Sequence, residues 1–218
     1  MRQGRRVGSD GAETNLVLGY VLAGGGSTRF GRDKALVEIG GAPMLLRMRS
    51  LLSNVAKEVK VIAAAHKYAA LGVTSIGDHW EGQGPLAGII TALQTTEEIG
   101  SAAEWNLIVG CDMPFLTRKW LTYLAERAEA SSAEVVAPRS AQGLEPLCAC
   151  WRTSAAPKLQ RTFECGTRKI TEAMKHLRME VVDEADWKRF DTAGRLFWNM
   201  NTAADYDQAR RILEAQRA

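Results

Sequence analysis

The sequence predicts a single α/β domain, a Rossmann-like open and mainly parallel sheet with helices on both faces. The first observation is that short apolar runs alternate with stretches whose apolar residues recur at helical spacing, which is typical of strands and helices in a parallel sheet. The second is that glycines and acidic residues directly follow several apolar runs, at the place where such sheets bind ligands. The third is a length of 218 residues without an internal repeat or a linker, which fits one domain.

In the first half of the chain, a continuous apolar run at residues 16–22 predicts a buried strand. Pro43 opens the first helix, because proline suits the first helical turn. The apolar face of this helix consists of Met44, Leu45, Met48, Leu51, Leu52 and Val55. A second helix is expected to begin at the Gly84–Gly88 segment and to run through Leu93. Extended segments are expected at residues 35–39, 59–65, 73–76 and 105–110.

The second half is less regular. Thr117 is expected to cap a helix that runs to about Ala130, because threonine is a favoured N-cap residue. Strands are expected at residues 134–138, 146–151 and 179–182. Helices are expected at residues 154–163, 167–176 and 203–215.

The composition, 46% hydrophobic and 24% charged, is that of an ordinary globular protein. No apolar run approaches the roughly 18–20 residues that span a membrane. A net charge of +3 suits an anionic ligand but is too small to indicate nucleic acid. Residues 1–14 contain arginines and no apolar segment, so they do not predict a signal peptide. We expect a disordered tail at 1–14 and a folded domain at 15–218.

The cysteines are expected to be reduced core or surface residues. None of the four forms a Cys-x-x-Cys pair, so a zinc site is not indicated. Cys148 and Cys150 lie on one face of a predicted strand, which favours the core. Reduced thiols without an export signal are typical of a cytoplasmic protein.

The strongest functional signal lies between Leu22 and Leu36. Three glycines at 24–26 follow the first strand, and Arg29 and Lys34 come soon after. Glycine allows backbone angles that turn several N–H groups inward, and such groups form a cradle for anions. With two cations nearby, a polyphosphate is the expected ligand; the structural alternative is a mobile glycine turn.

Two common phosphate-binding motifs do not fit this segment. The dinucleotide motif requires a glycine where Arg29 stands when the pattern starts at Gly24. The Walker motif requires Lys and Ser or Thr after its last glycine, but Arg32 and Asp33 follow Gly31. The segment is therefore a different kind of phosphate loop.

The sequence Leu-Ala-Gly-Gly-Gly-Ser-Thr-Arg-Phe-Gly-Arg-Asp-Lys-Ala-Leu at 22–36 resembles the signature of nucleotidyltransferases. These enzymes transfer a nucleoside monophosphate from an NTP to a phosphate or a sugar phosphate. The Asp33-Lys34 pair makes the segment most similar to the molybdenum cofactor guanylyltransferases. The resemblance extends from about Gly19 to Ala215 and implies a nucleotide-diphospho-sugar transferase-like fold.

The resemblance also implies an activity and its partners. The expected reaction is transfer of GMP from GTP to the phosphate of molybdenum-molybdopterin, with release of pyrophosphate and with Mg²⁺ as cofactor. GTP, the molybdenum cofactor and other proteins of its biosynthesis are the expected partners, and nucleic acid and membranes are not.

Acidic residues at the ends of later strands are candidates for the same site. Asp112 follows the strand at 105–110, and its carboxylate is a hard oxygen ligand of the kind Mg²⁺ prefers. Asp78 follows the strand at 73–76 and could accept hydrogen bonds from ribose hydroxyls or from the N1 and N2 edge of guanine. The structural alternative for each is a turn or a cap.

Lys34 and Arg29 have expected roles in catalysis, together with Asp112. Phosphoryl transfer depends mainly on positioning and on stabilisation of negative charge. Lys34 would stabilise the leaving pyrophosphate and Arg29 would act less directly, the alternative for both being a solvated surface charge. No serine, cysteine or histidine stands among these residues as a nucleophile, so direct displacement is expected.

The resemblance assigns further residues. It implies nucleotide binding by Leu22, Ala23, Gly24, Gly25, Lys34, Asp78, Gly84, Pro85, Leu86 and Asp112. It implies acceptor binding by Arg168, Asn199 and Asn201. Some members have an asparagine after the second strand that touches the nucleotide, but residues 62–65 here are Ile-Ala-Ala-Ala, so no contact is assigned to them.

Two other functions remain open at this point. One is another nucleotidyltransferase of the same fold, either a molybdopterin cytidylyltransferase or a sugar-phosphate nucleotidyltransferase. The other is a non-catalytic nucleotide-binding regulator. Lys34 and Asp112 favour an enzyme, because a protein that only binds nucleotide needs neither a metal ligand nor transition-state charge.

Overall fold

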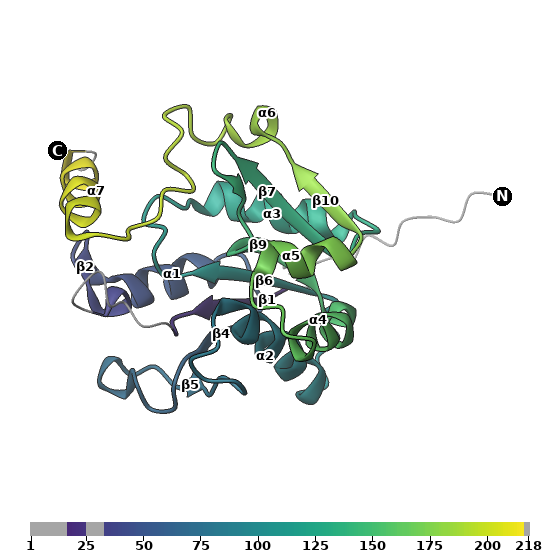
Figure 1. Ribbon diagram of the computed structural model, residues 1–218. Helices are drawn as coiled ribbons and strands as arrows, with labels where there is room; N and C mark the ends of the chain where they lie inside the picture. The colour runs from purple at the N-terminus through teal and green to yellow at the C-terminus, as the bar shows by residue number, and fades with distance from the viewer. Residues whose placement is uncertain (1–16, 25–32, 216–218) are drawn as a thin grey trace, which may run out of the picture.

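The computed structural model describes residues 17–24 and 33–215, and these residues form a central sheet between two layers of helices (Figure 1). The tail expected at 1–14 and the loop residues Gly25 and Arg29 lie outside the described residues. The sheet has eight strands, ordered β10-β7-β9-β6-β1-β4-β5, with β8 paired to β7. The strands are β1 (Val17–Leu22), β4 (Val59–Ile62), β5 (Ser75–Ile76), β6 (Trp105–Gly110), β7 (Val135–Ser140), β8 (Gly143–Leu144), β9 (Cys148–Arg152) and β10 (Met179–Val182).

The sheet is mainly parallel, as the sequence predicts. Strand β1 runs parallel to β4 and β6, and β5 and β10 run parallel to their neighbours β4 and β7. Strand β9 runs antiparallel to both β6 and β7. The carboxyl ends of β1, β4, β5, β6 and β7 therefore lie at one edge of the sheet.

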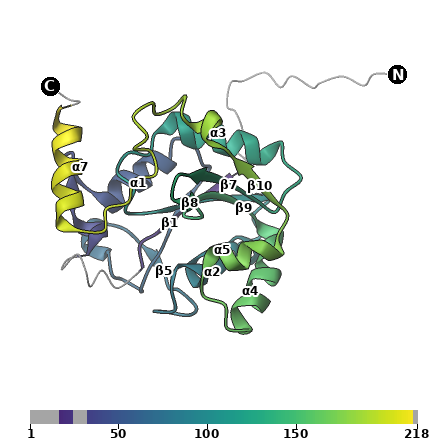
Figure 2. The same ribbon diagram turned by 45° about the horizontal axis from the view of Figure 1, so that its top comes forward.

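Helices cover both faces of the sheet (Figures 1 and 2). The side chains of β1 alternate between the two faces, because successive residues of a strand point to opposite sides. Val17 and Val21 pack with one set of helices, and Leu18 and Tyr20 pack with the other. The first set is α1 (Met44–Leu52), α3 (Arg118–Glu129), α6 (Glu184–Trp187) and α7 (Ala203–Ala215). The second is α2 (Pro85–Glu98), α4 (Ala156–Glu164) and α5 (Ile170–Ala173).

Local signals in the sequence explain most of these elements. Thr117 caps α3, and its hydroxyl accepts a hydrogen bond from the backbone N–H of Trp120 at 3.2 Å. Gly84 has a φ of 95°, which suits glycine, and Pro85 occupies the first turn of α2. Cys148 and Cys150 are fully buried in the core, as expected.

Several expected elements differ from the structure in type or in limits. The strand expected at 59–65 ends at Ile62, and the helix expected to run through Leu93 continues to Glu98. Residues 34–36 form the 3-10 helix η1 (Lys34–Leu36) rather than an extended segment, because the Asp33 side chain accepts a hydrogen bond from Ala35 N at 3.0 Å and caps the turn. After it comes a short hairpin, β2 (Glu38–Ile39) and β3 (Ala42–Pro43). The helix expected at 167–176 begins only at Ile170 and continues as the 3-10 helix η4 (Met174–His176). The strand expected at 73–76 is limited to Ser75–Ile76, and it is followed along the chain by α2.

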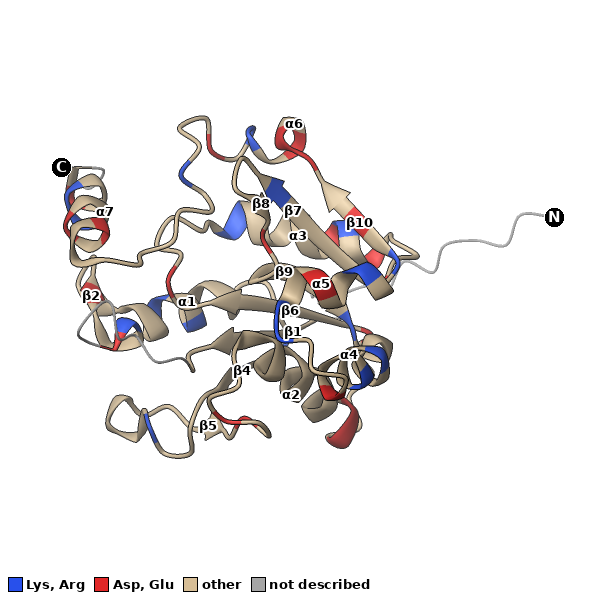
Figure 3. Cartoon of the chain, viewed as in Figure 1, with Lys and Arg blue, Asp and Glu red and all other residues tan. Residues whose placement is uncertain are grey.

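The other two 3-10 helices are η2 (Ala69–Leu71), between β4 and β5, and η3 (Thr153–Ala155), before α4. Among the described residues, no helix is both long and apolar enough to cross a membrane. Charged side chains are distributed over the outer helices and loops, and the strands β1 and β6 carry none (Figure 3).

Candidate functional site

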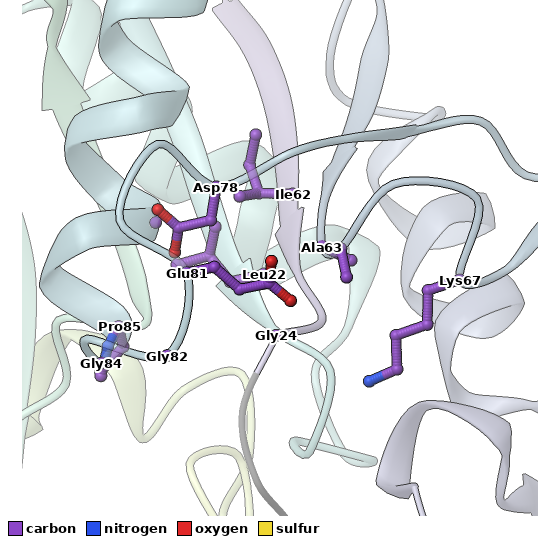
Figure 4. Close-up of a pocket in the computed structure, with 12 residues that line it drawn as sticks. Leu22, Gly24, Ile62, Ala63, Lys67, Asp78, Glu81, Gly82, Gly84 and Pro85 are labelled. Atoms are coloured by element: carbon purple, nitrogen blue, oxygen red, sulfur yellow. The ribbon is translucent and has the colours of Figure 1, made fainter.

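A cavity of about 400 Å³ opens at the carboxyl ends of β1, β4 and β5 (Figure 4). Its walls come from the end of β1, from the segment after β4 and from the loop that leads into α2. Five of the predicted nucleotide-binding residues line it: Leu22, Gly24, Asp78, Gly84 and Pro85. Residues far apart in the sequence thus share one cavity, as the strand-end argument predicts.

The cavity is polar at its two ends and apolar between them. Asp78 and Glu81 lie at one end, and Lys67 lies at the other, beyond Gly24 (Figure 4). The middle is formed by the end of β1 and by Ile62 of β4. Such an arrangement suits an elongated ligand with hydrogen-bond donors at one end and negative charge at the other.

Asp78 both fixes its own loop and faces the cavity. Its Oδ1 accepts hydrogen bonds from the backbone N–H of Trp80 at 3.0 Å and from the hydroxyl of Thr91 at 3.2 Å. Thr91 lies on α2 and is fully buried. The turn expected as the structural alternative is therefore present, and it holds the carboxylate at the wall of the cavity.

Helix α2 packs against the ends of β1 and β4 at Gly88. A Cβ atom at Gly88 would lie 3.4 Å from Leu22 Cδ1. This close packing places the N-terminus of α2 beside the end of β1. Leu86, in contrast, is fully buried beneath the helix, so its side chain does not line the cavity.

Lys34, Asp112 and Asn201 meet just beyond the carboxyl end of β6, the neighbour of β1, although they are far apart in the sequence. None of the three is among the residues that line the cavity. The ammonium of Lys34 donates a hydrogen bond to Asn201 Oδ1 at 2.8 Å and lies 3.4 Å from Asp112 Oδ2. The backbone N–H of Met200 donates to the carbonyl of Asp112 at 2.9 Å, which fixes the segment before α7 against the end of β6. The Lys34 and Asp112 side chains are only 16% and 23% exposed, so their charges interact in a partly desolvated place.

The two other predicted acceptor-binding residues have different surroundings. Asn199 donates a hydrogen bond to the carbonyl of Phe197 at 3.3 Å and thus supports its own turn. Arg168 donates to the side chain of Gln83 at 3.1 Å and to the carbonyl of Phe163 at 2.7 Å. It therefore borders the loop between Asp78 and α2, whereas Asn201 contacts Lys34.

Sequence reasoning missed several residues at this edge of the sheet. Lys67 and Glu81 line the cavity, and Asp33 accepts from Lys67 at 2.8 Å. The nearly buried Glu145 accepts from the Ser140 hydroxyl at 2.6 Å. Burial raises the pKa of Glu145, the Ser140 hydrogen bond opposes this, and the charge of Asp112 raises the pKa further. The available signals were an acidic loop after β5 and a glutamate inside an otherwise apolar strand region.

The thiol next to Asp112 is a poor nucleophile. Burial raises the pKa of Cys111 to about 12, and the negative charge of Asp112 contributes to the same shift. Because the thiolate is the reactive form, Cys111 stays unreactive near neutral pH. This agrees with the expectation that any transfer at this site proceeds by direct displacement.

Residues 19–182 match the family described as the MobA-like NTP transferase domain. The chain belongs to this family. It is a nucleotidyltransferase, and the phosphate-loop segment and Asp112 fall within the matched residues.

Curated relatives match nearly the whole chain. A probable molybdenum cofactor guanylyltransferase of Pelotomaculum thermopropionicum is 32% identical over 91% of this chain and 94% of its own length. A relative of the same name from Carboxydothermus hydrogenoformans is 30% identical over 88% of this chain and 94% of its own length.

Solved structures show the same fold. Molybdopterin-guanine dinucleotide biosynthesis protein A from Archaeoglobus fulgidus superposes with a TM-score of 0.76 at 26% identity, over 91% of this chain and 99% of that protein. A nucleotidyl transferase from Methanothermobacter has a TM-score of 0.70 at 16% identity, over 93% of this chain and 99% of that protein. The expected nucleotide-diphospho-sugar transferase-like fold is thereby confirmed.

Proposed function

We propose that this nucleotidyltransferase transfers GMP from GTP to the terminal phosphate of molybdenum-bearing molybdopterin. An oxygen of the acceptor phosphate would form a bond to the α-phosphorus of GTP. The bond between the α-phosphorus and the bridging oxygen would break, and pyrophosphate would leave with the bonding electrons. The choice of GTP and molybdopterin is supported by the names of the relatives and by the shared family.

The observation that carries the catalytic part of the proposal is the contact of Lys34 with Asp112 and Asn201 beyond the carboxyl end of β6, the strand next to β1. The ammonium is held by two oxygens, so it requires little reorganisation when negative charge develops on the pyrophosphate. Preorganised charge of this kind acts mainly on the transition state. Arg29 would assist, although it lies outside the described residues.

The cavity would hold the nucleotide with its base at the acidic end and its phosphates toward the glycines. Asp78 uses Oδ1 for contacts within the chain, and we assign its other oxygen to the ribose hydroxyls or to the guanine edge. Gly24 would supply a backbone N–H group to the phosphate oxygens, whereas Gly84 and Pro85 lie on the side of Asp78 and Glu81 and would face the base or the ribose (Figure 4). Ala23 and Gly25 extend the same segment, and Gly25 lies outside the described residues.

A Mg²⁺ ion would be held by the Asp112 carboxylate, which has two hard oxygens, of which Oδ2 contacts the Lys34 ammonium. These donors fit Mg²⁺, which usually takes one or two protein oxygens and completes its shell with phosphates and water. The described residues contain no group of three or more His, Cys, Asp and Glu side chains that could hold a metal. When bound, the ion would neutralise charge on the triphosphate.

The test measures pyrophosphate release with Mg²⁺, molybdopterin and each of GTP, CTP, ATP and UTP. The expected result is turnover with GTP. Turnover with CTP would indicate the cytidylyl reaction, turnover only with a sugar phosphate would indicate the sugar-phosphate class, and nucleotide binding without any turnover would indicate a regulator.

The variant Lys34→Ala tests the catalytic role directly. We expect kcat to fall by roughly 10²-fold or more, the usual scale for the loss of one preorganised electrostatic group, while KM for GTP rises by a smaller factor. Lys60→Ala is a matched control, because Lys60 lies on β4, its side chain is 18% exposed and it is paired with Glu58. If Lys34→Ala raised only KM, the lysine would serve in docking and the catalytic assignment would be wrong.

A further inference from the structure

Tyr68 contacts two segments that flank the glycine-rich region in the sequence. It lies between β4 and β5 and is 1% exposed. Its hydroxyl donates a hydrogen bond to the carbonyl of Ala23 at 2.7 Å and lies 3.0 Å from Asp33 Oδ2. One phenol group therefore joins the residue that follows β1 to the residue that precedes Lys34.

The environment keeps this phenol in its donating form. Burial is the main reason that the pKa of Tyr68 is raised well above its ordinary value, and the charge of Asp33 raises it further. The hydroxyl has one proton, whereas the carbonyl of Ala23 and the carboxylate of Asp33 both only accept. The ammonium of Lys67 lies 2.8 Å from Asp33 Oδ2 and supplies a positive partner for this carboxylate. The carboxylate is therefore satisfied even though the single proton of the Tyr68 hydroxyl is directed to Ala23.

Each of the two joined segments leads to a different part of the site. Ala23 is followed by Gly24, which lines the nucleotide cavity. Asp33 caps η1 by accepting from Ala35 N at 3.0 Å, and Lys34 is the first residue of that turn. A chain of polar contacts from Asp33 through the Tyr68 hydroxyl to the carbonyl of Ala23 therefore fixes the position of Lys34 relative to the cavity.

We propose that Tyr68 is a positioning residue for nucleotidyl transfer, whose hydroxyl fixes the Asp33–Lys34 turn against the strand end that forms the phosphate side of the cavity. The inference rests on the proposed function, because it acts through the catalytic role of Lys34. The chain offers a comparison for a purely structural role. Tyr20 is also fully buried, and its hydroxyl is 2.8 Å from the Thr96 hydroxyl among buried residues on the other face of β1.

The experiment compares Tyr68→Phe with Tyr20→Phe by thermal unfolding and by steady-state kinetics of pyrophosphate release. Both variants lose one buried hydroxyl, so we expect similar decreases in Tm, of about 2–6 °C. We expect only Tyr68→Phe to lower kcat, by about tenfold, because a misplaced catalytic group loses transition-state stabilisation. A kcat for Tyr68→Phe equal to that of Tyr20→Phe overturns the proposal.

A double-mutant cycle provides the second readout. In a Lys34→Ala background, Tyr68→Phe should change the residual kcat by less than about twofold, because the residue acts through the lysine. Multiplicative losses would show an independent effect and overturn the proposal. Asp33→Ala breaks the same connection if Tyr68→Phe folds poorly, and it should lower kcat to the same extent.

Failure of the proposed function is distinguishable from failure of this inference. If the wild-type chain prefers another NTP, the function assignment is wrong, and the same ratios between variants and wild type are measured with that NTP. If the wild-type chain binds nucleotide without turnover, the ratios are taken from the nucleotide Kd, which should rise for Tyr68→Phe and not for Tyr20→Phe. A wild-type chain that binds no nucleotide overturns both.

Discussion

Gly110→Ala should separate the position of the Asp112 carboxylate from the stability of the fold. Gly110 is the last residue of β6, and a Cβ atom built there would lie 2.9 Å from Asp112 Oδ1 and 3.6 Å from Leu147 Cβ. The distance to Asp112 Oδ1 is shorter than Cβ atoms show in real structures, whereas the distance to Leu147 Cβ is an ordinary van der Waals contact. The carboxylate, which is the end of a flexible side chain, must therefore move, while the backbone need not.

The size of the effect follows from this geometry. Moving a side-chain carboxylate by a few tenths of an ångström costs little free energy, and alanine is better than glycine in a strand by roughly 0.5–1 kcal/mol. We therefore expect Tm to change by less than about 3 °C. A catalytic group displaced by about 1 Å can lose about 10²-fold in rate, so a shift of a few tenths of an ångström should lower kcat/KM by about 3- to 10-fold.

The assay is Mg²⁺- and GTP-dependent pyrophosphate release, with thermal unfolding measured on the same samples. Gly19→Ala is the matched control. A Cβ atom there would lie 3.1 Å from Ala56 Cβ and 3.4 Å from Leu52 Cβ, and overpacking of this kind costs about 1–3 kcal/mol. Gly19→Ala should thus lower stability and leave kcat unchanged. Wild-type activity in Gly110→Ala would refute the assignment of Asp112 to the catalytic centre.

Two further predictions use other parts of the structure. A Cβ atom at Gly24 would meet nothing within 4 Å, so Gly24→Val should fold normally while its side chain fills part of the cavity. We expect a titration to show GTP binding weakened at least tenfold, equivalent to about 1.4 kcal/mol. Unchanged affinity would show that this wall of the cavity does not contact nucleotide. Burial opposes the ionisation of Glu134, but hydrogen bonds from Arg178 N and Lys158 outweigh it and lower the pKa of this carboxyl. Its stabilisation is therefore complete above its unfolded-state pKa and is lost as pH falls through the lowered folded-state pKa, so Glu134→Gln should lower Tm at pH 7 but not in acid. An equal deficit at both pH values would contradict this account.

The sequence alone determined much of the fold. Residues 105–110, 179–182 and 203–215 have the predicted structure with the predicted limits. The two strands are short runs that alternate with helices, and the helix has an apolar face at regular spacing, so local patterns suffice. The mainly parallel sheet also followed from the sequence, because the order of strands and helices allows few other arrangements.

The sequence did not determine how some segments end. A single hydrogen bond from the Ala35 N–H to the Asp33 carboxylate makes residues 34–36 a 3-10 turn, so the extended segment expected at 35–39 is limited to Glu38–Ile39. The helix expected at 167–176 is shortened because Lys169, directly before Ile170, is extended, and Gly166 further upstream has a positive φ of 97°. These outcomes depend on local hydrogen bonds and backbone angles that apolar spacing does not encode.

For the site, the sequence identified residue types and the tertiary structure decided their partners. The place of Gly24, Lys34, Asp78 and Asp112 at one edge of the sheet could be predicted, because they follow strands whose carboxyl ends share that edge. The contact of Lys34 with Asn201 joins residues 167 positions apart, and the contact of Tyr68 with Ala23 spans 45. Such contacts form only when the packed sheet brings separate loops together, so local patterns in the sequence do not predict them.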